Sequence, residues 1–442
     1  MRFGRKPAAL LLLLLSMLLT GCTSGSVDRL YCLPKRSESH RDLQLAIDAA
    51  MGGMEYSAPR SGENLQAVQV RDLDGDGKGE YLLFAKKAGD RPLQILIFRP
   101  TADGYALSET IETYGTAFDR VEYANIDGKP GYELIVGRRL SDQVIRAVSV
   151  YSFAEGQSAL LTTDNYTHFT TCDLDGDGNG ELLVFKHGEA AEQTGVAVYY
   201  SYRDGIMERS AEVSMSAPTE NVKRILVGWL ADNRMAVFAA STVEENAIVT
   251  DVFSVVDGKF TNLTLSGEAG NGVGMVRNYY VYADDIDNDG VTELPELISM
   301  RPLSESESPG DSQYLIRWYA LRSDGTREQK LYTYHNYESG WYISIQSDWA
   351  QRLTIVQDGT SYGVYLWNAD NTESEKLLTV YAFSGQDRET QAVSGNRFLL
   401  YEGDTVQYAA ELEVAAVRYG VTKDRLIRNF HLIQQDWKTG ET

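Results

Sequence analysis

The sequence is poor in the residues on which most catalytic and redox sites depend. It has three cysteines and five histidines in 442 residues. The histidines are scattered and show no metal-ligand spacing; they are His40, His168, His187, His335 and His431. A Gly-x-Ser-x-Gly elbow and a phosphate-binding loop are also missing. We therefore expect no catalytic residues, and nothing in the sequence requires an enzyme.

Positive charge is scarce as well. Lys and Arg number 41 against 63 Asp and Glu, which gives a formal net charge of -22. A surface this acidic repels phosphate backbones, so nucleic acid is excluded as a partner. Charge alone also disfavours adhesion to anionic lipid headgroups.

Export is indicated by the first 22 residues. Arg2, Arg5 and Lys6 form a basic start, and the apolar run that follows ends at Leu19, too short to span a bilayer comfortably. Leu19-Thr20-Gly21-Cys22 resembles the lipobox of bacterial lipoproteins. The resemblance implies a signal peptide over 1–21, a diacylglyceryl group on Cys22, a linker over 22–38 and a location on the extracytoplasmic face of the cell membrane. The alternative is an ordinary secreted protein with a coincidental cysteine.

The other two cysteines, Cys32 and Cys172, could pair in an oxidising compartment. For Cys172 we favour the simpler interpretation of a small buried apolar residue.

Helical patterns occur only near the two ends of the chain. Residues 39–59 hold a predicted helix over 40–51, with Leu43, Ile47 and Met51 on one face and Ser39 as a possible N-cap. Residues 403–442 are predicted as a helical segment, with one helix from 404 or 405 to 418 and a second from Thr422 toward 432. Between them, residues 60–402 read as short strands and turns.

An internal repeat covers this middle region. Clear copies begin at residues 72, 125, 173 and 285, and a hidden copy fits 224–240, with only a short Asp232-Asn233 turn in place of the acidic loop. Strands recur at 349–356 and 396–401. Seven such units of roughly 50–60 residues predict an all-β fold, a seven-bladed β-propeller, with six or eight blades as alternatives.

Three of the copies carry the pattern Asp-x-Asp-x-Asp-Gly-x-x-Glu. Alternate acids in a tight turn, with a backbone carbonyl at the seventh position, make the oxygen-rich site that Ca²⁺ prefers, and Mg²⁺ ranks second. An EF-hand is excluded, because its twelfth position needs a Glu and two of the three loops have an apolar residue there. We predict about three calcium ions. The predicted ligands are Asp72, Asp74, Asp76, Lys78, Glu80; Asp173, Asp175, Asp177, Asn179, Glu181; Asp285, Asp287, Asp289, Val291 and Glu293.

The copy at 125 departs from this pattern. It keeps Asn125, Asp127 and Glu133, but Lys129 stands in place of the third Asp. An ammonium there could replace the cation and form an internal ion pair.

These repeats resemble the FG-GAP/VCBS repeats of integrin-α-like propellers, and the whole arrangement resembles a group of uncharacterised bacterial lipoproteins. The resemblance implies calcium in the loop between the first two strands of some blades, and roles mostly in adhesion and ligand binding. We therefore predict a non-enzymatic binding or adhesion protein, whose extracellular partner is a glycan or a cell-surface protein. The alternatives are a calcium-dependent polysaccharide lyase or glycan-processing enzyme, and a purely structural envelope component.

Two observations would separate these functions. An enzyme should place a basic residue and convergent acids in one central pocket. A glycan-binding face should expose aromatic rings. The candidate rings are Tyr279, Tyr280, Tyr282, Tyr332, Tyr334, Tyr337, Trp341 and Tyr342, for which blade packing is the favoured alternative.

The lipobox gives a direct prediction. Cys22→Ala removes the only sulfur at the cleavage site, so the protein should be released from membranes or stay unprocessed. Membrane fractionation and the mass of the mature protein measure this. A mutant as membrane-bound and as fully processed as the wild type would refute the anchor.

Overall fold

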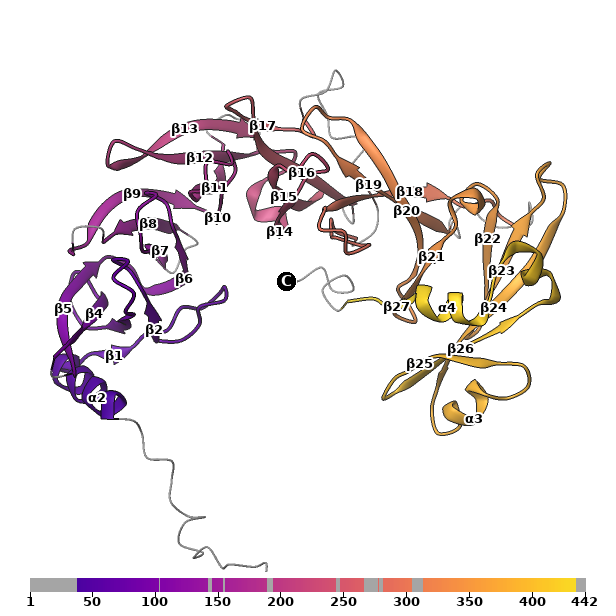
Figure 1. Ribbon diagram of the computed structural model, residues 1–442, viewed down its shortest axis with the longest axis horizontal. Helices are drawn as coiled ribbons and strands as arrows, with labels where there is room; N and C mark the ends of the chain where they lie inside the picture. Colours follow the sequence, from indigo (N-terminus) through magenta and orange to yellow (C-terminus); the bar gives the residue numbers. More distant parts are fainter. Residues whose placement is uncertain are drawn as a thin grey trace, which may run out of the picture.

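The computed structural model describes residues 38–434, apart from 103, 142–144, 154–155, 189–193, 244–246, 266–276, 278–280 and 304–312. The described residues form six antiparallel sheets of four or five strands. Figure 1 shows these sheets following one another along an open arc in the order of the sequence, with the first and last sheets apart at its two ends. Repeated four-stranded antiparallel sheets of this kind are the blades of a β-propeller.

The first three sheets each contain one loop of the repeat, beginning at residues 72, 125 and 173. Sheet one consists of β1 (Glu55–Tyr56), β2 (Val68–Arg71), β3 (Glu80–Lys86), β4 (Leu93–Thr101) and β5 (Gly104–Thr113). Sheet two consists of β6 (Ala117–Ala124), β7 (Glu133–Arg139), β8 (Arg146–Ser152) and β9 (Ala159–Tyr166). Sheet three consists of β10 (His168–Cys172), β11 (Glu181–His187), β12 (Gly195–Arg203) and β13 (Ile206–Ser214).

The last three sheets complete the arc. Sheet four follows η2 (Thr219–Asn221) and consists of β14 (Val222–Trp229), β15 (Met235–Val243), β16 (Ala247–Val256) and β17 (Lys259–Asn262). Sheet five consists of β18 (Glu293–Ser299), β19 (Tyr314–Leu321), β20 (Arg327–Asn336), β21 (Trp341–Ile345) and β27 (Phe430–Leu432). Sheet six follows η5 (Ser347–Trp349) and consists of β22 (Leu353–Asp358), β23 (Ser361–Trp367), β24 (Ser374–Ser384), β26 (Val406–Leu412) and β25 (Phe398–Glu402), with α3 (Arg388–Ala392) between β24 and β25.

The apolar core is divided into layers between neighbouring sheets. Phe84 of β3 and Phe118 of β6 are both fully buried, and their rings meet edge to face at 5.0 Å between centroids. Similar clusters lie between each following pair of sheets. Because each inner sheet is covered on both faces, its second strand is an almost continuous apolar run, as in residues 182–185 of β11.

Sheet one is the first sheet of the described residues, and α2 (Glu38–Met51) covers one of its faces. Leu43 and Ile47 pack against Leu83, Ala85 and Phe98. The predicted helix is therefore confirmed, together with its end at the two glycines 52 and 53, which both have positive φ. It starts two residues earlier than predicted, at Glu38, so Ser39 lies inside the helix and is not its N-cap.

The C-terminal segment differs from its prediction. Residues 406–412, expected as helix, form β26, which pairs with both β24 and β25. Tyr408 and Ala410 alternate along the strand and are both buried. They belong to the apolar core between sheets five and six, so one face of β26 contributes to that core. Beyond it lie η6 (Val414–Tyr419) and α4 (Lys423–Asn429), and the expected cap of α4 at Thr422 is present.

The blade count of seven is not confirmed, since the described residues form six sheets. The hidden copy at 224–240 is present as β14 and β15. The two later anchors, however, belong to one sheet. The anchor at 349–356 leads into β22, and the anchor at 396–401 leads into β25 at the opposite edge of sheet six.

The aromatic clusters serve mainly in packing. Tyr282, Tyr332, Tyr334 and Trp341 are buried, and Tyr337 and Tyr342 are partly buried against a core cluster. The favoured interpretation, packing within the blades, therefore holds for the four buried rings, and an exposed sugar-stacking role does not. Tyr279 and Tyr280 lie outside the described residues.

The helix that covers sheet one allows a matched test of this packing. Ile47 is 3% exposed and Leu45 is 61% exposed on the same helix. Ile47→Ala should lower the free energy of unfolding by about 2–5 kcal/mol, because it leaves a cavity against β3 and β4. Leu45→Ala should change it by less than about 0.5 kcal/mol. Urea denaturation measures both, and equal losses would contradict this placement of α2.

Candidate metal centres

Two of the three acidic loops join the first two strands of a repeat, and the third is closed by an isolated bridge. Loop 72–80 lies between β2 and β3, and loop 173–181 lies between β10 and β11. Loop 285–293 precedes β18, where Asp284 and Glu293 form an isolated antiparallel bridge. The sixth residue of each loop is a glycine with φ between 82° and 93°, a backbone conformation that side chains disfavour. This glycine turns the chain back so that alternate carboxylates face one point.

The ninth residue, a glutamate, closes every loop. Its Oε2 accepts a hydrogen bond from the backbone N–H of the second loop residue. In the loops at 72, 125, 173 and 285 the N···O distances are 2.8, 2.6, 2.7 and 3.2 Å. The side chain of this second residue enters the core between sheets, fully so for Leu73, Ile126 and Leu174. The glutamate thus fixes both the turn and the apolar residue beneath it.

Because these glutamates are buried, a positive charge nearby would stabilise their ionised form. Glu80, Glu181 and Glu293 are at most 3% exposed. Burial raises the pKa of the Glu181 and Glu293 carboxyls to about 8. Oε1 of Glu293 is buried and accepts no hydrogen bond from the described residues. A cation beside these oxygens would favour their ionised form, so the residues fit a bound metal ion.

The aspartates bring further oxygens to the same point. Asp173 accepts hydrogen bonds from the N–H groups of Gly176 and Gly178 at 2.7 and 3.0 Å, and the first aspartates of the other two loops are held in the same manner. Ligand oxygens of Asp173, Asp175, Asp177 and Glu181 all lie within 4.8 Å of one another.

The other two loops gather three of their four acids within the same distance. Loop 72–80 brings together Asp72, Asp74 and Glu80, while Asp76 is held by Lys78, with Nζ 3.3 Å from Oδ2. Loop 285–293 gathers its three aspartates without Glu293. All four predicted carboxylates of loop 173–181 therefore converge, but one is missing from each of the other groups.

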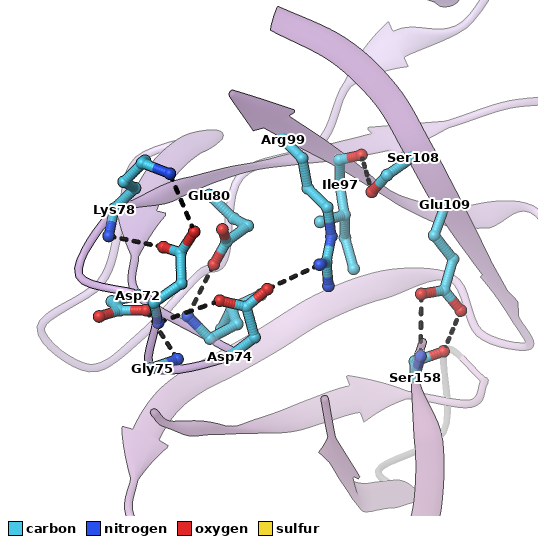
Figure 2. A network of polar contacts seen from close by, with 12 residues as sticks. Asp72, Asp74, Gly75, Lys78, Glu80, Ile97, Arg99, Ser108, Glu109 and Ser158 are labelled. Atoms are coloured by element: carbon cyan, nitrogen blue, oxygen red, sulfur yellow. Dashed lines mark hydrogen bonds and ion pairs between the residues drawn. The ribbon is translucent and has the colours of Figure 1, made fainter. Parts of the chain in front are cut away.

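The acidic loops also differ in the cations that reach them from neighbouring strands. Figure 2 shows Arg99 of β4 reaching Asp74, with an N···O distance of 2.7 Å. Lys330 of β20 lies 2.6 Å from Asp289. In loop 173–181 the corresponding contact is neutral, since the hydroxyl of Tyr199 donates to Asp175 at 3.4 Å. No Lys or Arg of the described part of the chain pairs with an acid of that loop.

Sequence reasoning missed Arg99, Lys330 and Tyr199. Arg99 and Tyr199 stand 27 and 26 residues after the start of their loops. Ser152, 27 residues after Asn125, makes the equivalent contact to Asp127 at 3.4 Å. Extending the repeat alignment to the third strand of each blade would have located these positions. Lys330 has no such signal, because it lies on β20, two strands after the strand that follows its loop, whereas Arg99 and Tyr199 lie one strand after it.

The loop at 125–133 carries its own cation, as predicted. Nζ of Lys129 lies 3.3 Å from Oδ2 of Asp127, whose side chain is 2% exposed. Asn125 keeps the turn, because its Oδ1 accepts from Gly128 and its Nδ2 donates to the carbonyl of Lys129 at 2.5 Å. This loop therefore has the fold of its neighbours without their excess negative charge.

The first three loops also touch one another. The N–H of Gly180 donates to the carbonyl of Asn125 at 2.6 Å. A Cβ added to Gly75 would come within 2.4 Å of Pro130, so only glycine fits there. The Lys129 loop is thus packed between two acidic loops.

The remaining predicted site residues stay predictions. At the seventh position, the N–H groups of Lys78, Asn179 and Val291 donate to the preceding aspartates, and ligation by their carbonyls is not tested. Cys22 and Cys32 lie outside the described residues. Burial raises the pKa of the Cys172 thiol to about 12, which fits a neutral, partly buried residue.

A polar cleft lies beside these loops on the concave side of the arc, where β2, β6 and β10 run. We call it the inner cleft; its volume is about 640 Å³. It is lined by Glu63, Asn64, Arg71, Arg120, Val121, Glu122, Tyr123, Tyr132, Thr170 and Thr171.

The inner cleft combines acids with arginines. Oε1 of Glu122 lies 2.6 Å from Nε of Arg120, and its Oε2 accepts from the Thr171 hydroxyl at 2.9 Å. Burial raises the pKa of Glu122 despite this arginine. Arg71 stacks on the ring of Tyr123 at 4.9 Å. Acids and basic residues in one cleft are the arrangement expected of an enzyme, but equally of a site for a polar ligand.

Comparisons with known proteins identify no family. No family model matches the chain, and no curated protein matches it. Among solved structures, the exotype rhamnogalacturonan lyase YesX is 14% identical over 70% of this chain and 74% of its own, with a TM-score of 0.31. The rhamnogalacturonan lyase of Bacillus licheniformis is 12% identical over 76% and 80%, with a TM-score of 0.31.

A third similar structure is the β-propeller domain of the Trilobed protease from Pyrococcus furiosus. It is 12% identical over 75% of this chain and 89% of its own, with a TM-score of 0.28. Such low similarity supports no conclusion about ligand or activity, and the blade architecture rests on the sheets of this chain itself. No helix in the described residues is long and apolar enough to cross a membrane.

The raised pKa of Glu181 predicts how metal affinity depends on pH. Below about pH 8 the metal-free protein holds a proton on Glu181, and a bound metal must displace it. Affinity should therefore fall as the pH drops below about 8, and metal uptake at pH 7 should release protons. Calorimetry in two buffers of different ionisation enthalpy measures this release.

Glu181→Gln is the matched control for this effect. Its side chain keeps an acceptor for the N–H of Leu174 but carries no proton to release, so proton release at this loop should disappear. Metal affinity that stays constant between pH 6 and pH 9 in the wild type would contradict the assignment.

Proposed function

We propose that this protein is an exported, lipid-anchored β-propeller stabilised by calcium, which binds a ligand on the extracytoplasmic face of the cell membrane. The proposal rests chiefly on the geometry of loop 173–181. Its four carboxylates converge within 4.8 Å, and the described part of the chain supplies no basic side chain to offset them. A divalent cation is the simplest partner for such a cluster.

Calcium fits the three acidic loops better than magnesium. Every donor is an oxygen, and the number of converging carboxylates varies from three to four. Ca²⁺ accepts six to eight oxygens in flexible geometry, whereas Mg²⁺ demands a near-ideal octahedron and keeps several waters. The resemblance of the repeats to FG-GAP/VCBS units supports the same choice, with about three ions per chain.

The main role of the metal is structural. Each ion would hold the first two strands of a sheet together, on the turn that also anchors a core residue. At about 1 mM external calcium and a dissociation constant near 10 µM, each site would add roughly 2.7 kcal/mol. That amount is a sizeable fraction of the stability of a domain.

Ligand binding is assigned to the concave side of the arc. The inner cleft has the volume of a small-molecule site, and it offers hydroxyls, carboxylates, guanidinium groups and tyrosines. These groups suit a glycan or a polar segment of a cell-surface protein. A glycan and cell-wall ligand array, probed with and without calcium, tests the assignment, and Arg71→Ala should weaken any binding found.

Metal analysis tests the calcium sites. We expect about three Ca²⁺ per chain after dialysis. Chelation should speed hydrogen exchange most around 173–185, less around 72–84 and 285–298, and least around 125–136, because the built-in cations of the last three segments stay in place. Zero bound metal, Mg²⁺ in place of Ca²⁺, or equal acceleration in all four segments would contradict this.

A pair of variants isolates the contribution of one loop. Asp175→Ala should reduce the rise in melting temperature that calcium produces. Asn125→Ala removes hydrogen bonds in the Lys129 loop but should leave that calcium-dependent rise unchanged. If both variants reduce it equally, the metal is not confined to the acidic loops.

A glycan-processing enzyme is the second candidate, favoured by Glu122 and the two arginines in the inner cleft. Incubation with acidic polysaccharides and calcium, followed by assays for new reducing ends and for unsaturated products, tests it. If activity is found, Glu122→Gln should lower it by about 10²-fold or more. Binding without any product would leave the non-enzymatic proposal in place.

A further inference from the structure

A second cavity lies at the opposite ends of the strands from the acidic loops. It has a volume of about 430 Å³ and sits where sheets one and two meet. Lys86 is the last residue of β3, Thr116 directly precedes β6, Arg139 ends β7 and Arg146 begins β8. All of these positions are at the strand ends remote from loops 72–80 and 125–133. We call this the basic cavity.

The charge of the basic cavity is opposite to that of the protein. Four of its lining residues are cationic, namely Arg60, Lys86, Arg139 and Arg146, and none of the described lining residues is acidic. The whole chain has a net charge of -22. In so acidic a protein, four cations around one cavity are more than the average composition of the surface would give.

One buried carboxylate beneath the cavity orients two of the arginines. Asp119 is 2% exposed, and its Oδ1 accepts from Nε of Arg139 at 2.8 Å. Its Oδ2 accepts from the hydroxyl of Tyr166 at 2.8 Å and lies 3.5 Å from Nη1 of Arg146. A single carboxylate cannot neutralise four cations, so the cavity keeps a positive potential.

The arginine before Arg139 in β7 is buried and does not line the cavity. Arg138 is 6% exposed and donates to the Ser149 hydroxyl at 2.7 Å and to the Tyr114 carbonyl at 3.1 Å. It also donates to the Thr113 hydroxyl. All three acceptors are neutral oxygens, so its charge is not offset by a carboxylate of the described residues.

Donors remain available at the cavity itself. Nζ of Lys86 donates to the carbonyl of Thr116 at 3.0 Å, and an ammonium has three N–H groups. Arg60 is exposed and forms no ion pair within the described residues. The side chains of Arg139 and Arg146 are 37% and 29% exposed, so their guanidinium groups reach solvent. Guanidinium and ammonium groups together bind oxyanions by charge-assisted hydrogen bonds.

We propose that the basic cavity binds the oxyanion group of an acidic ligand: a carboxylate, phosphate or sulfate. Its volume suits a ligand of one or two sugar units. Ile145, 53% exposed at the rim, offers an apolar contact beside the charged groups. The site is separate from the acidic loops, so it gives the propeller a binding position at each end of its strands.

Calorimetric titration of the purified protein in calcium-containing buffer tests the proposal. The probes are trigalacturonate, inorganic phosphate and sulfate, and a neutral galactose trisaccharide serves as the control ligand. We expect at least one anion to bind one-to-one and the neutral sugar not to bind. The anion that binds most tightly identifies the source of the oxyanion.

Variants locate the binding. Arg60→Ala and Lys86→Ala should each weaken it by about tenfold or more, the loss of one charge-assisted hydrogen bond. Lys87→Ala is the matched control, because Lys87 is the next residue but pairs with Glu112 at 2.6 Å outside the cavity. It should change the affinity by less than about twofold.

Two outcomes would overturn the proposal. One is the absence of binding by all three anions. The other is an equal loss of affinity in Lys86→Ala and Lys87→Ala, which would show unspecific attraction. Calcium titration of the same samples reports on the acidic loops separately, so failure here is distinguishable from failure of the metal sites.

Discussion

The structure depends on a buried glutamate at the ninth position of each loop. Glu80, Glu133, Glu181 and Glu293 each accept a hydrogen bond from the N–H of the loop's second residue. That second residue places its side chain between two sheets. One contact therefore links the turn, the first two strands and the apolar core. The cost is a carboxylate taken out of water, which needs a proton or a nearby cation.

The loops meet this need in different ways. In the loop at 125 the chain supplies Lys129. Arg99 and Lys330 come from neighbouring strands and partly offset the loops at 72 and 285. Loop 173–181 receives a hydroxyl, from Tyr199, and no basic side chain from the described residues. Dependence on an external cation should follow this order, and the loop with the least internal positive charge should gain the most from metal.

Much of the fold follows from local patterns in the sequence. The helix over 40–51, the acidic turns and the hidden copy at 224–240 were predictable because periodicity and turn residues act over short distances. The strand at 406–412 was not, because its isolated sequence also suits a helix and only pairing with β24 decides between them. The count of seven blades is not confirmed, and strand patterns alone do not say which strands share a sheet.

The candidate sites also divide into those that local sequence predicts and those that it does not. The acids of each metal loop are close in sequence, so their spacing was enough to predict them. The inner cleft and the basic cavity gather residues from separate strands and sheets, as Arg60, Lys86 and Arg146 show. Such sites can be identified only from the structure, in which the sheets lie side by side. The cations Arg99 and Lys330, which set the charge of two metal loops, are absent from the loop pattern for this reason.

The central claim is that external metal occupies the loops in which the chain does not supply enough positive charge. Anomalous diffraction from crystals grown with calcium tests it most directly. We predict a calcium peak about 2.3–2.6 Å from carboxylate oxygens of Asp173, Asp175 and Asp177, and no peak in loop 125–133, where Lys129 pairs with Asp127. Peaks of equal height in both loops, or no peak at 173–181, would contradict the account.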